Sequence, residues 1–304
     1  MPLLVLIVLV AVISVIEPAF IPGGGIRVTA VQAVPIILLA SGQMFALLLG
    51  GIDLSNAAIA LFCTVLSAKL LISVGGVAPI LTIAAGALIG ALVGFLSGWL
   101  QVPTFAVTLG AMGVCQAGSL MLSGQSTVNA SDDLHPVEWM LNYRLLGLEL
   151  AVWMSLGICL ALWAFLRGTV IGQQLRSVGL NERASILSGV GNLRARVVAY
   201  TVSGTLAAMA GIFLVTQQGA AGATGAGGSL LLPGIAAAIV GGCAVTGGVA
   251  RPINVLIGSL ILALIPIGCA AVGVDPSMQQ LIVGLIIVVA VVITIDRRRR
   301  GATK

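Results

Sequence analysis

The residues with the clearest chemical potential lie at 50–55, Gly-Gly-Ile-Asp-Leu-Ser, where one carboxylate stands between two apolar runs. An ionisable side chain inside a membrane segment often marks a proton or ion pathway. Nothing basic lies nearby in sequence to neutralise Asp53. A structural role is also open, because Gly50-Gly51 can break one helix and Asp53 or Ser55 can cap the next. Both roles, a place in a translocation path and a helix cap, remain open for Asp53.

Residues that support catalysis, metal binding or nucleotide binding are scarce. The chain has one histidine, His135, and five cysteines without a CxxC pair, so neither a nucleophile triad nor a metal-ligand cluster can be assembled. No G-x-x-x-x-G-K-[ST] motif occurs, and the only lysines are Lys69 and Lys304. We therefore expect no enzyme activity, no metal and no cofactor on this chain.

The composition is that of a membrane protein. Of the 304 residues, 59% are hydrophobic and 8% are charged, with a mean hydropathy of +1.19; a soluble domain carries about 25% charged residues. A span needs ~20 mainly apolar residues, and lipid requires helices that pair their own backbone groups. We predict an all-α polytopic membrane protein with about ten transmembrane helices, at 2–21, 30–50, 55–73, 76–100, 103–122, 148–167, 197–217, 230–247, 252–273 and 277–295.

The positions of the charges predict the topology. Arginines gather at 167–196, at Arg251 and at 297–300, and with ten spans these three places share one side of the membrane. The positive-inside rule makes that side, and both termini, cytoplasmic. The acidic loop 123–147 is then periplasmic, and Arg27 and Lys69 are exceptions towards the outer face. We expect residues 1–304 to form a single transmembrane domain. The net charge of +5 is a topology signal here and does not indicate a nucleic-acid partner.

Four glycines recur every four residues in the fourth predicted span, at Gly86, Gly90, Gly94 and Gly98. They lie on nearly one face of a helix, which predicts close approach of another helix.

Two further segments have unusual patterns. In 167–196, Asn181 can cap a short helix over Glu182–Leu187, with Ser188-Gly189 ending it. Such an element either docks in a groove of a partner or is a basic topology anchor, and the residues leave both open. Residues 232–252 contain a proline and two Gly-Gly pairs. This stretch predicts either a broken helix at membrane depth or a short span followed by a glycine-rich turn.

Four blocks in order resemble one family, the permease subunits of ribose-type sugar importers of the ATP-binding cassette (ABC) class. They are GGIDLS at 50–55, the PTFAVTLG block within 102–124, VGLNERASILSGV at 178–190 and LPGIAAAIVGGCAVTGG at 232–248. The resemblance extends over about residues 30–295. It implies the ABC importer permease fold, in the inner membrane of a bacterium.

The resemblance also implies partners. A second permease, identical or different, would complete the pore. A separate cytoplasmic subunit would bind ATP and Mg, and a periplasmic binding protein would deliver the sugar. The segment 167–196 would be the cytoplasmic coupling segment. The coupling residues would be Arg176, Asn181, Glu182, Arg183, Ala184, Ser188 and Gly189. The candidates for the translocation path or a helix break are Gln43, Gly51, Asp53, Ser55, Thr108 and Gln116.

Two other functions remain open on the sequence. The alternative from a different class is an ion- or proton-coupled secondary carrier that uses Asp53. A non-transporting scaffold is a third, although a scaffold would not require the broken stretch at 232–252.

Overall fold

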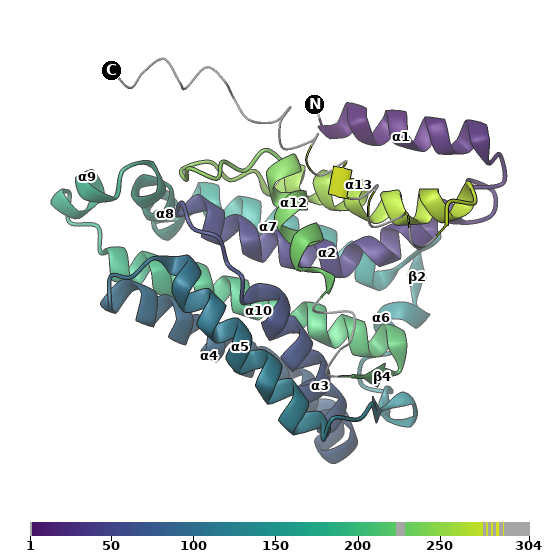
Figure 1. Cartoon of the computed structure of the whole chain (residues 1–304), viewed down its shortest axis with the longest axis horizontal. Coiled ribbons are helices and arrows are strands. Elements are labelled where there is room, and N and C mark those ends of the chain that lie inside the picture. The colour runs from purple at the N-terminus through teal and green to yellow at the C-terminus, as the bar shows by residue number, and fades with distance from the viewer. Residues whose placement is uncertain are drawn as a thin grey trace.

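The computed structural model describes residues 2–222 and 229–275, with isolated positions at 278, 281, 284, 285 and 288. The described part is mainly helical, with two short antiparallel strand pairs (Figure 1). The helices are α1 (Pro2–Ile16), α2 (Gly25–Leu48), α3 (Asn56–Val74), α4 (Ala78–Trp99), α5 (Thr104–Ser123), α6 (Trp139–Asn142), α7 (Leu150–Gly168), α8 (Val170–Leu180), α9 (Glu182–Leu187), α10 (Asn192–Gln218), α12 (Leu231–Val240) and α13 (Pro252–Ala271). The strands are β1 (Val128–Asn129), β2 (Arg144–Leu145), β3 (Leu148–Glu149) and β4 (Ala220–Ala221), and short 3₁₀ turns lie at Gly75–Val77 and Ser131–Asp133.

Six stretches of the described residues are long and apolar enough to cross a membrane. One of them, Asn56–Trp99, contains both α3 and α4 joined by the turn at Gly75–Val77. The chain is therefore a multi-pass membrane protein. Two predicted spans are shorter than expected: α1 has 15 residues and α12 has 10. Glu17-Pro18 follows α1, and a proline disfavours the helical backbone conformation at the residue before it. The glycines at 241–242 follow α12. The predicted span 277–295 lies outside the described residues except for a few isolated positions.

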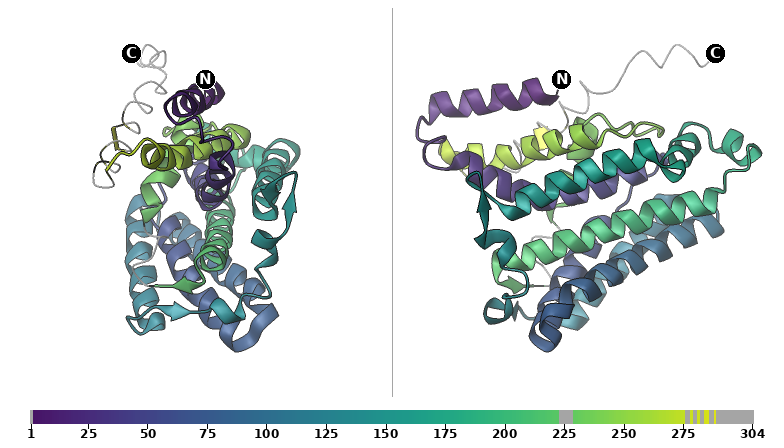
Figure 2. Two further views of the ribbon diagram at one scale, coloured as in Figure 1. Left: turned by 90° about the vertical axis from the view of Figure 1, so that its right-hand side faces the viewer. Right: turned by 180° about the vertical axis from the view of Figure 1, so that it is seen from behind.

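The helices form layers around α2 and α10. From the outside inwards, α1 packs on α13, α13 on α2, and α2 on α10, whose opposite side carries α3 and α4 (Figures 1 and 2). The most apolar stretch of α2 is 89% buried and that of α10 is 67%, whereas those of α5 and α7 are 17% and 22% buried. Thus α2 and α10 form the centre, and α5 and α7 lie on the surface of this single chain.

The predicted glycine face of α4 packs against α10. A Cβ atom at Gly90 would lie 2.1 Å from the Tyr200 carbonyl oxygen, and one at Gly94 would lie 2.6 Å from that of Arg196. A Cβ atom at Gly204 on α10 would lie 2.2 Å from the Gly86 carbonyl oxygen. Gly98 meets Leu193 at the end of this contact. The two backbones therefore touch along most of their shared length, as small residues allow.

The two ends of the bundle differ. We call the end with α8, α9 and the turn 241–251 the arginine-rich end; α6, β2 and β4 lie at the opposite end (Figure 1). At that opposite end β1 pairs with β4, and β2 pairs with β3. Glu149, whose side chain is 4% exposed, forms ion pairs with Arg27 at 2.6 Å and Arg144 at 3.5 Å. This buried carboxylate is the partner that the sequence did not reveal for Arg27.

Candidate functional site around Gly50–Ser55

The Asp53 carboxylate is fully buried at the start of α3. Its Oδ1 accepts hydrogen bonds from the Ser55 N–H (2.9 Å), the Ser55 hydroxyl (2.6 Å) and the Asn56 N–H (3.2 Å). These two N–H groups belong to the free N-terminal donors of the helix, where negative charge is also stabilised by the helix dipole. Asp53, two residues before the N-cap residue Ser55, therefore caps the N-terminus of α3 with its side chain.

The other oxygen of Asp53 connects the cap to the central helix. Ser203 on α10 donates its hydroxyl to Oδ2 at 2.8 Å and accepts from the Asn56 side-chain amide at 2.8 Å. Gln43 on α2, with its amide oriented to satisfy both neighbours, donates to the Asp53 carbonyl and accepts from the Asp53 N–H. Three helices thus meet at Asp53, α2 at its backbone and α3 and α10 at its carboxylate, and no described basic side chain forms an ion pair with it.

The N-terminal part of α5 contacts the same segment. Thr108 donates its hydroxyl to the Ile52 carbonyl at 3.4 Å. A Cβ at Gly51 would lie 2.5 Å from the Thr104 hydroxyl oxygen and 3.2 Å from that of Tyr200, so only glycine leaves room here. The sequence singled out Thr108 and Gly51 but not Tyr200, because nothing in the sequence places α10 beside this segment.

The turn after α12 and the end of α8 meet the end of α2. The Gly248 N–H donates to the Leu48 carbonyl at 2.9 Å, and a Cβ at Gly179 would lie 1.8 Å from that same oxygen. Gly247 and Gly248 have φ angles of 91° and 79°, which favour glycine. α12 ends at Val240 and this glycine-rich turn follows it, so 232–252 is not one regular helix. The other three sequence blocks of the resemblance therefore contact the segment 48–55, which contains the first block.

The predicted helix over Glu182–Leu187 is confirmed as α9. The Asn181 side chain accepts from the Ala184 N–H at 3.0 Å, and Gly189 follows the helix with φ 82°. Helix α8, which precedes it, was not predicted separately, and α10 begins five residues earlier than expected, at Asn192.

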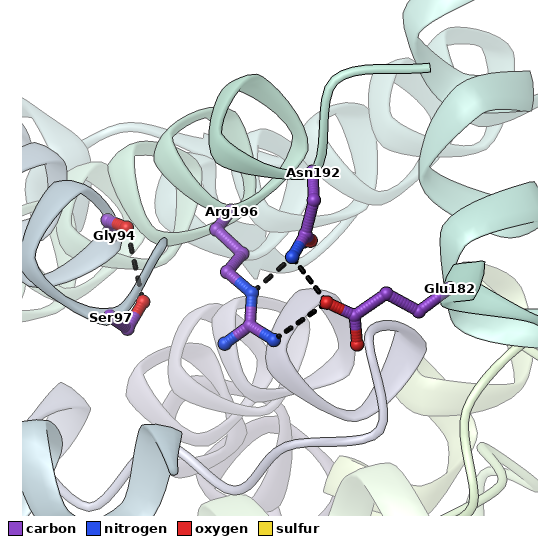
Figure 3. A network of polar contacts seen from close by, with 5 residues as sticks. All are labelled: Gly94, Ser97, Glu182, Asn192 and Arg196. Carbon is purple, nitrogen blue, oxygen red and sulfur yellow. Dashed lines mark hydrogen bonds and ion pairs between the residues drawn. The ribbon is translucent and has the colours of Figure 1, made fainter. Parts of the chain in front are cut away.

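A polar bracket ties α9 to the first turns of α10 (Figure 3). Glu182 accepts from the Asn192 amide and from Arg196, whose nitrogen lies 3.3 Å away, and Arg196 also donates to the Asn192 side-chain oxygen at 3.2 Å. The Glu182 carboxylate is therefore held within the chain. The exposed apolar tip of α9 is Leu187, at 89% exposure, with Ile186 at 52% beside it. Neither was singled out from the sequence.

The remaining candidates are spread over the surface of the arginine-rich end and of α5. Arg183, Ala184, Ser188 and Gly189 are exposed around α9, and Arg176 is half-buried on α8. Gln116 lies exposed on α5. The residues described contain no group of three or more His, Cys, Asp or Glu side chains that could hold a metal ion.

Residues 26–291 match the family described as branched-chain amino acid transport system / permease component. The ribose import permease protein RbsC of Bacillus subtilis is 32% identical, covering 98% of this chain and 92% of that protein. RbsC of Escherichia coli K12 is 30% identical over 96% and 92%, and the fructose import permease FrcC of Rhizobium meliloti is 31% identical over 86% and 75%. No solved structure matches.

The chain therefore belongs to this family of permeases, and within it to the ribose-type permeases of ABC importers.

Proposed function

We propose that this chain is a membrane subunit of an ABC importer that carries a sugar or sugar-like solute across the bacterial inner membrane. Its similar proteins are named for the import of ribose, fructose and D-allose, which supports a sugar without selecting one. Both termini would be cytoplasmic, the arginine-rich end would face the cytoplasm, and the whole chain would act as one domain.

Transport would proceed by alternating access, driven by a separate subunit that binds ATP and Mg. The observation that carries this proposal is α9: a capped helix with an exposed apolar tip, joined to the central helix α10 through Glu182. A movement imposed on α9 by the ATPase would be transmitted to α10 and, through the glycine contact, to α4. The binding protein would dock at the opposite end.

The pore would form between two permeases, identical or different, with α5 at their interface. Gln116 is exposed on α5, and Gly110 and Gly113 have no neighbouring atoms within 4 Å of an added Cβ. A glutamine facing lipid is unfavourable, so this face fits a partner helix or a water-filled path. In contrast, the Asp53 carboxylate has protein donors on both oxygens, and no structural observation favours the proton-coupled carrier.

Reconstitution tests this function. The chain is placed in proteoliposomes with its ATPase subunit and binding protein, and uptake of labelled ribose, fructose and allose is measured. We expect uptake of at least one sugar that requires ATP and stops when the ATPase is omitted. Uptake driven by a proton gradient without the ATPase would contradict the proposal and support the carrier.

A further inference from the structure

An open cavity of about 390 Å³ lies at the arginine-rich end, outside the Asp53 cluster and away from α9. Its walls are the last turns of α7, α8, and the backbone from Gly248 through the first turn of α13. Three arginines line it, Arg167 on α7, Arg176 on α8 and Arg251 before α13. Arg176 also stands among the coupling candidates, but the coupling role proposed above rests on α9 and Glu182 and does not use this cavity.

The three guanidinium groups have no carboxylate partner in the described part of the chain. The four ion pairs found there involve Arg27, Arg144, Arg196 and His135. Arg167 instead lies over the Trp163 ring, 5.2 Å from its centroid. Pro252 at the start of α13 has no N–H, but no side chain caps this helix, so the N–H groups of Ile253 and Asn254 in its first turn remain available. The cavity therefore offers concentrated positive charge and hydrogen-bond donors to an anion.

The position of the cavity selects the kind of anion. α7 ends and α13 begins at it, and both are spanning helices, so it lies at the level of lipid headgroups. Trp163 is 38% exposed, and Leu160, one turn earlier on α7, is 48% exposed. These apolar side chains lead from the cavity along the lipid-facing surface of α7. If these arginines served only to fix the membrane topology, they would not need to line one common cavity.

We propose that this cavity binds the phosphate headgroup of an anionic phospholipid. The arginines and the start of α13 hold the phosphate, and the acyl chains lie along Leu160 and Trp163. Basic residues near a membrane surface each contribute about fivefold to the affinity for anionic lipid. Loss of two of them should remove most of the preference.

The test uses Trp163 as the reporter. The full chain with Trp99, Trp139 and Trp153 replaced by Phe is placed in nanodiscs containing brominated phosphatidylglycerol or brominated phosphatidylcholine, and quenching is compared. We expect phosphatidylglycerol to be preferred at least about fivefold over phosphatidylcholine. The variant Arg176→Gln/Arg251→Gln should lower this preference at least about fivefold, and the remaining preference would come from Arg167. The control variant Arg183→Gln/Arg194→Gln removes two charges at the arginine-rich end that do not line the cavity, and it should leave the lipid preference unchanged.

Several results would overturn the proposal. Equal quenching by the two lipids, or an unchanged preference in Arg176→Gln/Arg251→Gln, would exclude a specific lipid site. Displacement of the lipid by millimolar inorganic phosphate would assign the cavity to a soluble anion. If Arg176→Gln/Arg251→Gln kept its lipid preference but no longer associated with the ATPase subunit, the cavity would be assigned to binding of that subunit. Native mass spectrometry of the unsubstituted chain with both lipids decides the preference if the tryptophan variants do not fold.

Discussion

At the scale of single residues, the burial of Asp53 is compensated by hydrogen bonds. A charged group at the centre of a membrane costs ~2.5–3.5 kcal/mol on the insertion scale. Two backbone N–H groups and two hydroxyls, from Ser55 and Ser203, compensate this carboxylate. Its geometry is that of a cap that joins α3 to α10, and this explains how a lone carboxylate is kept between two apolar runs.

Asp53 and Ser203 should therefore act as a unit. Asp53→Asn leaves the Ser203 hydroxyl facing a donor, and Ser203→Ala leaves Oδ2 without its hydroxyl partner. Each change should destabilise the protein by about 1–3 kcal/mol, seen as a lower melting temperature of the purified protein in detergent. The double variant should be no less stable than the worse single variant, because neighbouring residues are not additive. Additive losses would show that the hydrogen bond contributes nothing.

At the scale of elements, glycines decide which helices touch. α4 and α10 approach through Gly86, Gly90, Gly94 and Gly204, while Gly157 on α7 has no neighbour within 4 Å of an added Cβ. Equivalent residues therefore have opposite tolerance to substitution, depending on the face that they occupy.

Gly90→Ala should destabilise the protein by about 1–3 kcal/mol, because its Cβ would overlap the Tyr200 carbonyl. Gly157→Ala is the matched control, and it should be neutral or stabilising, since alanine has the better helix propensity. Thermal denaturation of the two variants compares them directly. Equal melting temperatures would mean that α4 and α10 do not pack as described.

The bracket between α9 and α10 gives a second test at this scale. Glu182→Gln should loosen α9 and reduce the coupling of ATP hydrolysis to transport, with more ATP hydrolysed for each sugar imported. Arg183→Gln, the neighbouring exposed residue outside the bracket, should have the smaller effect. The affinity of the binding protein for sugar should stay the same in both. Unchanged coupling in Glu182→Gln, and in a Glu182/Arg183 double replacement, would exclude 178–190 as the coupling element.

At the scale of the whole molecule, burial separates an inner pair of helices from two open ones. α2 and α10 are enclosed, and α5 and α7 are not. Both open faces carry apolar side chains, such as Val114 and Met121 on α5 and Leu160 and Trp163 on α7, but within the membrane-spanning part only that of α5 also carries an exposed amide, Gln116. A partner permease on α5 and lipid on α7 account for this difference.

Cross-linking checks that assignment. Cys269 is the one cysteine that is not buried, and it is first replaced by Ser. If the partner is a second copy of this chain, Gly113→Cys on α5 should then form a disulfide between the two introduced thiols, seen as a product of twice the mass of the chain. Gly157→Cys on α7 should remain uncross-linked. The reverse pattern would place the partner on α7.

The sequence by itself determined what depends on local pattern. Apolar length predicted spans that match α3, α4, α5 and α13 closely, the four-residue glycine repeat predicted the packing face of α4, and Asn181 with Ser188-Gly189 predicted α9. Each of these rests on contacts within a few residues or on one helix face. The four blocks of the resemblance also pointed to the family that the comparisons show.

Only the tertiary structure decided which distant groups meet. It placed Ser203 on Asp53, Glu149 on Arg27, and Glu182 on Asn192 and Arg196, pairs separated by between 10 and 150 residues. It also gathered Arg167, Arg176 and Arg251 around one cavity. The physical reason is that a buried polar group needs a hydrogen-bonding partner, but the sequence does not say which helix supplies it. The packing of α10 against α2, α3 and α4 decides this.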